Sequence, residues 1–249
     1  MVAVLAACSS SATQPQPQPA ASSGSHHLTS KTIDQLSKTE LIARILGVNA
    51  HVIVLKSQAT FPEYRDVLAS VEKTAGVVAA EPFIFVELLA SSDKVHDVSI
   101  ALKGVDPKRV RGVLDISSHI TAGSIAALDD STPAILVGDL LADTLKVGVG
   151  DRVTLGSPQN VESPGPPKQF RVRGIFHTDF DEYDRRLAYA SLAATQDIVG
   201  RGDQAMGIEA RTNDPDRAGA IGDAIEKTLG GPPYQVMDWK ELNQGALGP

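Results

Sequence analysis

Two strand-helix-strand patterns lie at opposite ends of the globular part of this chain, and they restrict its fold more than any other feature. The first covers residues 51–91 and the second covers residues 206–238; each joins two strand-like runs by an amphipathic segment of helical period. Pro62 and Pro215 stand in the first turns of the two expected helices, where proline is favourable. Strands are expected at 51–56, 77–91, 206–211 and 234–238, and helices at 62–74 and 214–229.

These two units define the expected fold class. Two β-α-β units that pair into one sheet give a ferredoxin-like layer, so the chain is predicted to be α+β. The residues between the units are then an inserted, mixed α/β subdomain. Further strands are expected at 95–103, 134–137, 151–155 and 169–176, and further helices at 32–46, 106–114 and 139–145.

One segment of the insertion is too rich in proline and glycine to be helix or strand. Residues 156–167 hold prolines at 158, 164, 166 and 167 and glycines at 156 and 165. We expect a protruding loop between two strands. The polar run 177–186 is expected to be a second, solvated loop.

Composition excludes several classes of function. The chain has 249 residues, 23 Lys+Arg and 30 Asp+Glu, so its formal net charge is −7. Binding to a nucleic-acid backbone is not expected, because such proteins neutralise phosphates with clustered basic residues. No apolar run reaches the roughly 18 residues that a membrane-spanning helix needs, so no membrane span is predicted.

The N-terminal segment 1–30 contains no charged residue and holds the single cysteine, Cys8. A short apolar run is followed by a tract of Pro, Gln and Ser, which is typical of an export segment and a semi-extended linker. Leu5-Ala6-Ala7-Cys8 resembles the lipobox of bacterial lipoprotein signal peptides, which implies lipidation of Cys8. The alternative is a small hydrophobic cysteine in an unstructured N-terminus.

Known catalytic motifs are absent from the sequence. It has no nucleophile elbow, phosphate-binding loop, dinucleotide fingerprint or zinc-protease motif. Its densest polar cluster is the run from His177 to Arg186, whose oxygens could chelate calcium, but the glycine of a calcium loop is missing. For a hydrolase that uses His177, Asp179 or Asp181, no activating partner follows from the spacing. We therefore predict a binding or coupling module, with no catalytic residue, metal site or cofactor.

A family resemblance supports that interpretation. In Ala134–Leu155 a strand ends in Gly138, a short helix carries Leu141-Ala142 and Leu145, and Gly150-Asp151 precedes a strand. This stretch resembles the signature of the periplasmic core domain of MacB-type ABC permeases. Shorter motifs, which together cover about residues 40–244, resemble the lipoprotein-releasing LolC and LolE branch; they lie at 45–54, 104–107, 174–176 and 238–243.

The resemblance implies a domain organisation. A porter-like subdomain would comprise residues 31–103 and 203–244, and a sabre-like subdomain, residues 104–202, would be inserted between them. It also implies a periplasmic domain without enzymatic activity that helps to pass lipoproteins to a soluble LolA-like carrier chaperone, together with permease and ATPase subunits of an ABC transporter. The alternative is a coupling or scaffold domain of another MacB-type system, in efflux or cell division, with a different periplasmic partner.

In the LolC branch a proline-containing hook between two strands binds the carrier. The corresponding loop here is 156–167, which is shorter than that hook. The expected partner-binding residues are Pro158, Val161, Pro164, Gly165, Pro167 and Lys168. The expected location is the periplasm, with a lipid anchor at Cys8 as an option.

Overall fold

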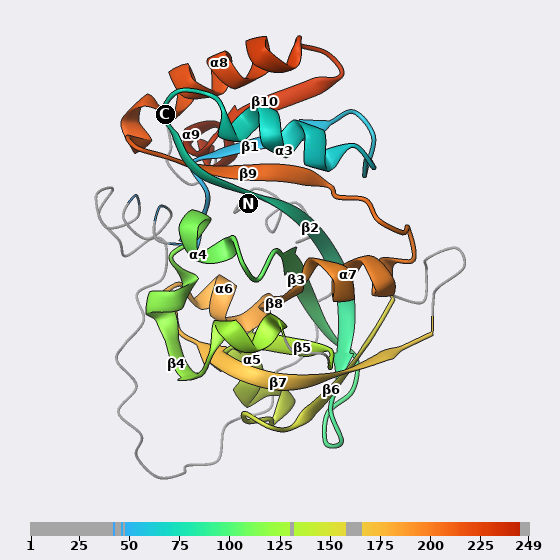
Figure 1. Cartoon of the computed structure of the whole chain (residues 1–249). Helices are drawn as coiled ribbons and strands as arrows, with labels where there is room; N and C mark the ends of the chain where they lie inside the picture. The colour runs from blue at the N-terminus through green and yellow to red at the C-terminus, as the bar shows by residue number, and fades with distance from the viewer. Residues whose placement is uncertain (1–41, 43–45, 47, 130–131, 158–165, 245–249) are drawn as a thin grey trace.

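The computed structural model describes residues 42, 46, 48–129, 132–157 and 166–244. Within them the chain forms two β-sheets that share one long strand (Figure 1). The expected tail 1–30 and most of the expected helix 32–46 lie outside the described residues. Ile42 and Leu46 from that helix pack against the core.

The first sheet is ferredoxin-like, as the sequence predicts. It contains, in spatial order, β10 (Tyr234–Asp238), β1 (Val52–Lys56), β9 (Gly207–Thr212) and the first half of β2 (Val77–Ser91). All neighbours are antiparallel. Helices α3 (Tyr64–Glu72) and α8 (Ala218–Leu229) contact each other and cover one face of this sheet (Figure 1). The prediction of an α+β fold built from two β-α-β units is confirmed.

Helical periodicity explains both helices of this layer. The buried side chains recur every three or four residues, which places them on one face. They are Tyr64, Val67, Leu68 and Val71 in α3, and Ala218, Ile221, Gly222 and Ile225 in α8. Gly222 brings α8 close to β10, because a Cβ atom at this position would lie 3.3 Å from Val236 Cγ1.

The second sheet closes into a barrel. Its strands are the second half of β2, β3 (Val98–Val105), β8 (Leu187–Ser191), β5 (Ala134–Gly138), β7 (Lys168–Phe176) and β6 (Arg152–Gly156). The ring closes because β6 pairs with both β7 and β2. The β3–β8 and β5–β7 pairs are parallel, and the other pairs are antiparallel. A short strand, β4 (Ile120–Gly123), extends the sheet from β7.

A separate hydrophobic cluster fills the barrel. Alternate residues of its strands point inward, and helix α5 (Asp139–Leu145) adds Leu141 and Leu145 to the same cluster. Its strand residues include Leu88, Ile100, Leu102, Ile135, Val137, Val153, Leu155, Phe170 and Val172. Burying each such side chain contributes about 1.5–3 kcal/mol to folding.

Strand β2 belongs to both sheets. Its residues up to Phe83 pair with β9, and those from Ile84 pair with β3. Strand β2 lies inside the segment 31–103, β3 lies inside it up to Lys103, and both strands contribute to the barrel. The division into porter-like and sabre-like segments stays a prediction about stretches of sequence.

The remaining elements are short and surround the two sheets. They are α4 (Val110–Val113), η2 (Ile116–His119), η3 (Ile125–Asp129), α6 (Asp181–Arg186), α7 (Leu192–Val199), η4 (Pro215–Arg217) and α9 (Trp239–Leu242). The expected helix 106–114 is reduced to α4, and the sequence did not predict β8 or α7. Among the residues that the structure describes, no helix combines the length and the apolar character required to cross a bilayer.

The expectation of a solvated loop at 177–186 is wrong. Residues Asp181–Arg186 form helix α6, and within it Tyr183 and Asp184 are buried. Tyr183 packs edge-to-face against Phe180 with ring centroids 4.8 Å apart. Phe180 and Tyr183 therefore pack into the core from a run whose other residues are polar, and Asp184 is buried next to them.

Candidate functional site

The described part of the predicted partner loop consists of its two ends. Strands β6 and β7 form an antiparallel hairpin in which Leu155 lies opposite Lys168. Pro167 is exposed, and the Lys168 ammonium forms an ion pair with Asp197 of α7. The other expected partner-binding residues, Pro158, Val161, Pro164 and Gly165, lie outside the described residues, as does Cys8.

The barrel holds the ends of this loop in place. Because β6 pairs with β2 on one side and β7 on the other, β6 is not a free edge at the level of Leu155. On its other side, β7 pairs with β5 from Arg171 onward. On the hairpin, Arg152 lies directly opposite Arg171. Arg171 donates a hydrogen bond to the Gly150 carbonyl at 2.8 Å, whereas Arg152 is exposed.

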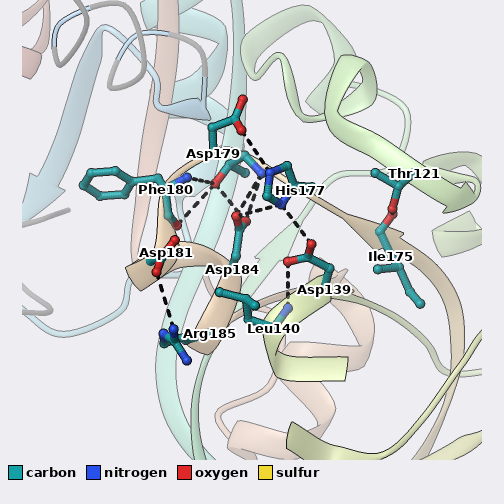
Figure 2. A network of polar contacts seen from close by, with 11 residues as sticks. Thr121, Asp139, Leu140, Ile175, His177, Asp179, Phe180, Asp181, Asp184 and Arg185 are labelled. Carbon is teal, nitrogen blue, oxygen red and sulfur yellow. Dashed lines mark hydrogen bonds and ion pairs between the residues drawn. The ribbon is translucent and has the colours of Figure 1, made fainter. Parts of the chain in front are cut away.

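A second polar site surrounds His177 (Figure 2). The His177 ring lies between three carboxylates. Its Nδ1 is 2.9 Å from Asp139 Oδ2 and 3.3 Å from Asp184 Oδ2, and its Nε2 is 2.9 Å from Asp179 Oδ1. Asp184 has no exposed surface and accepts hydrogen bonds from the amide and the hydroxyl of Thr178 at 2.9 and 2.8 Å.

Strand pairing explains why His177 and Asp139 meet. In the parallel β5–β7 pair Gly138 lies opposite Phe176, so the next residue of each strand emerges at the same edge of the sheet. Parallel strands bring their carboxyl ends to one edge. Asp184 arrives from α6, whose backbone touches Gly138. Asp181, another carboxylate of the polar run His177–Arg186, does not join them and pairs with Arg185 at 3.4 Å.

The environment changes the ionisation of this cluster. Burial raises the pKa of Asp184 to about 6, although hydrogen bonds from Thr178 act in the opposite direction. Burial acts to lower the pKa of His177, but the hydrogen bond to Asp179 and the charges of Asp139 and Asp184 outweigh it, so the pKa is raised. Both shifts favour an added proton on the cluster.

Asp139, His177 and Asp184 are the residues that could hold a metal ion. One ligand atom from each lies within 4.8 Å of the others. The polar atoms of these three side chains already contact one another, however. The neighbouring Thr178 hydroxyl donates its hydrogen bond to Asp184 and not to the imidazole of His177. The hydrogen bonds of the cluster tie the end of β7 to α5 and α6.

The sequence predicts only part of this site. Its densest polar run contains His177, Asp179 and Asp184, but Asp139 lies 38 positions from His177 along the chain. Periodicity in the sequence locates strands β5 and β7 but does not show that they are neighbours in the sheet. The Gly138-Asp139 pair directly after a buried strand was the available signal.

Two solved structures share this fold. The periplasmic region of MacB from Actinobacillus actinomycetemcomitans matches with a TM-score of 0.55 at 12% identity, over 83% of this chain and 96% of that one. The extracellular domain of the noncanonic ABC-type transporter YknZ from Gram-positive bacteria matches with a TM-score of 0.52 at 15% identity, over 76% and 99%. The chain therefore shares the fold of these two transporter domains.

The chain belongs to the family of MacB-like periplasmic core domains, whose model matches residues 22–228. Its relatives include the lipoprotein-releasing system transmembrane protein LolC of Xylella fastidiosa (strain Temecula1), 29% identical over 208 residues, which are 82% of this chain and 49% of the relative. LolC of Neisseria meningitidis serogroup B (strain MC58) is 25% identical over 210 residues, 82% and 50%. The chain thus spans about half the length of the curated relatives that it matches.

Proposed function

We propose that this chain is the non-enzymatic periplasmic domain of a lipoprotein-releasing ABC permease of the LolC/LolE type. The observation that carries the proposal is the similarity to LolC along 82% of the chain. The partners would be an ATPase subunit and other permease subunits of the transporter, lipoproteins as cargo, and a LolA-like carrier chaperone.

The hairpin of β6 and β7 is the proposed contact with the carrier. Its ends are fixed in the barrel, and Pro167 is exposed beside them. Like charges directly opposite each other on neighbouring strands are destabilising. The Arg152–Arg171 pair therefore suits a partner whose acidic side chains neutralise it.

A binding measurement tests this proposal. The whole chain is titrated with a purified LolA-type carrier, beside a variant in which residues 158–167 are replaced by Gly and Ser. The matched control replaces the exposed residues 57–59 between β1 and α3 in the same way. Binding that falls at least tenfold only in the hairpin variant supports the contact, and equal binding by all three proteins refutes it.

A second candidate is a coupling domain of another MacB-type system, which the fold shared with MacB and YknZ favours. Such a domain would bind a periplasmic adaptor or a cell-wall enzyme instead of a carrier. Parallel titrations with a MacB-type adaptor and a LolA-type carrier separate the two functions, because each predicts tight binding to one partner only.

A periplasmic location with a lipid anchor on Cys8 also remains a proposal. Mass spectrometry of the protein from membrane and soluble fractions decides it. A diacylglyceryl mass on the Cys8 peptide in the membrane fraction supports the anchor, whereas an unmodified Cys8 in the soluble fraction contradicts it.

A further inference from the structure

Three ionisable side chains meet inside the junction between the two sheets. Glu81 of β2, Glu209 of β9 and Lys103 of β3 each have at most 1% of their surface exposed. Glu81 lies directly opposite Glu209 in the β2–β9 register. The Lys103 ammonium donates a hydrogen bond of 2.7 Å to Glu209 Oε2. This ion pair ties the ferredoxin-like sheet to the barrel.

The charges of this cluster balance only if it carries an extra proton. Two carboxylates and one ammonium leave one negative charge uncompensated, which is strongly unfavourable in a buried site. A proton shared by the two carboxyl groups makes the cluster neutral. Like-charged carboxyls in contact hold a proton in this way because both cannot ionise together.

Unpaired oxygens point to the same proton. Within the described residues, Glu81 Oε1 and Glu209 Oε1 are buried without a hydrogen-bond partner, as is the hydroxyl of Tyr189, which lies opposite Lys103 in the β3–β8 register. Two carboxylate oxygens are both acceptors, so only an added proton can link them. The other oxygen of Glu81, Oε2, already accepts the Asp106 amide at 2.9 Å.

Of the two carboxyl groups, Glu81 is the one on which the shared proton is more stable. Glu209 already accepts the hydrogen bond from the Lys103 ammonium, whereas no ammonium donates to Glu81 in the contacts described. Burial and the adjacent Glu209 raise the pKa of Glu81 well above its usual value, while Lys103 and the Asp106 amide only partly oppose this. The groups that face Glu81 are Glu209, Lys103, Tyr189 and the Asp106 amide; Arg109 reaches the Ala80 carbonyl at 3.5 Å.

We propose that Glu81 and Glu209 hold one proton between them at neutral pH, and that losing it in alkaline solution loosens the junction between sheet and barrel. The protonated form adds a second link beside the Lys103–Glu209 bond. Without the proton, two buried carboxylates repel each other across β2 and β9 beside a single ammonium. The cluster is therefore a proton-dependent latch, and it does not depend on the proposed function.

This proton-dependent latch determines whether the stability of the protein rises or falls with pH. Between the unfolded pKa of a glutamate, near 4.5, and its raised folded pKa, the folded protein holds a proton that the unfolded chain has released. Stability then falls as pH rises, by about tenfold in the unfolding equilibrium constant per pH unit. The decline ends where folded Glu81 ionises.

Urea unfolding of the whole chain from about pH 5 to about pH 9 tests this. Glu81→Gln keeps an acceptor for the Asp106 amide and supplies a permanent donor toward Glu209. We expect the unfolding equilibrium constant of Glu81→Gln to rise less steeply with pH than that of the wild type, with a difference of about tenfold per pH unit. At pH 8 the variant should be more stable than the wild type. Glu87→Gln, on the same strand but half-buried and paired with Arg186, is the matched control and should keep the wild-type slope. Identical slopes for Glu81→Gln and the wild type would overturn the proposal.

A second measurement keeps the proposal testable if Glu81→Gln does not fold. In the wild-type protein the carboxyl carbon of Glu81 is followed by NMR through the same pH range, together with hydrogen exchange of the Asp106 amide. We expect a protonated carboxyl at neutral pH, and exchange that speeds up once the carboxyl ionises. Ionisation of Glu81 near its ordinary pKa, or Asp106 exchange that ignores this step, refutes the latch.

Discussion

Gly138 at the end of β5 and Asp184 in α6 touch so closely that a Cβ atom on Gly138 would lie 2.2 Å from the Asp184 carbonyl oxygen. No side chain fits into that space without moving α6. The contact positions Asp184 against His177, and it makes the carboxylate cluster depend on one glycine.

Replacing Gly138 by alanine should therefore destabilise the protein by about 1–3 kcal/mol, the usual cost of overpacking. Urea unfolding measures this. Gly148→Ala is the matched control, since its Cβ would come no nearer than 3.9 Å to a neighbour, and it should change stability by less than about 0.5 kcal/mol. Equal effects of the two substitutions would refute the steric explanation.

His177 should make stability depend on pH in one direction. Its raised pKa means that its contribution is fully present below about pH 6.5 and is lost as pH rises through the folded value. The raised pKa of Asp184, about 6, acts with the same sign at lower pH. His177→Ala should cost about 1 kcal/mol at pH 6 and less at pH 8. His96→Ala, at an exposed position, should leave the profile unchanged; a His177→Ala cost that does not vary with pH contradicts the prediction.

Breaking the buried ion pair from one side should be costly. Lys103→Met leaves Glu209 as an uncompensated buried charge, and removal of one partner of such a pair typically costs about 3–5 kcal/mol. The double variant Lys103→Met with Glu209→Leu should recover most of that loss, because the unpaired charge is removed with its partner. A double-mutant cycle by denaturant unfolding measures the coupling. Strictly additive losses would contradict it.

Charge reversal on the hairpin should weaken carrier binding if the proposed function holds. Arg152→Glu should lower the affinity for a LolA-type carrier roughly three- to tenfold at low salt, mainly through slower association. Lys73→Glu, at an exposed position after α3, carries the same charge change away from the hairpin and should bind like the wild type. The difference should shrink as salt screens it; equal binding by the two variants argues against an acidic partner surface.

Local periodicity was enough for much of the fold. The apolar residues of α3 recur at helical spacing, and those of β5 form one short apolar run. Both elements can therefore be predicted without knowledge of distant contacts. Helix α6 was missed because its sequence offers one apolar residue, Tyr183, and its burial depends on Phe180 packing in three dimensions. Segments whose burial is decided by tertiary contacts show no such pattern.

The candidate sites were less predictable than the fold. The sequence named His177, but its partner Asp139 becomes visible only once β5 and β7 are known to be parallel neighbours. Glu81 and Lys103 are charged residues within otherwise apolar strands, which is how a buried charged cluster shows in a sequence. This pattern does not show which charged residues are neighbours, because strand order and register determine that.

Strand β2 has a consequence for how this chain folds. Of the barrel strands, residues 104–202 contain in full only β8, β5, β7 and β6, because β2 and all of β3 up to Lys103 precede them. Expressed separately, that piece would leave β8 and β6 with open backbone edges, which invite aggregation. One uninterrupted strand thus makes the two sheets a single cooperative unit, which should melt in one transition rather than two.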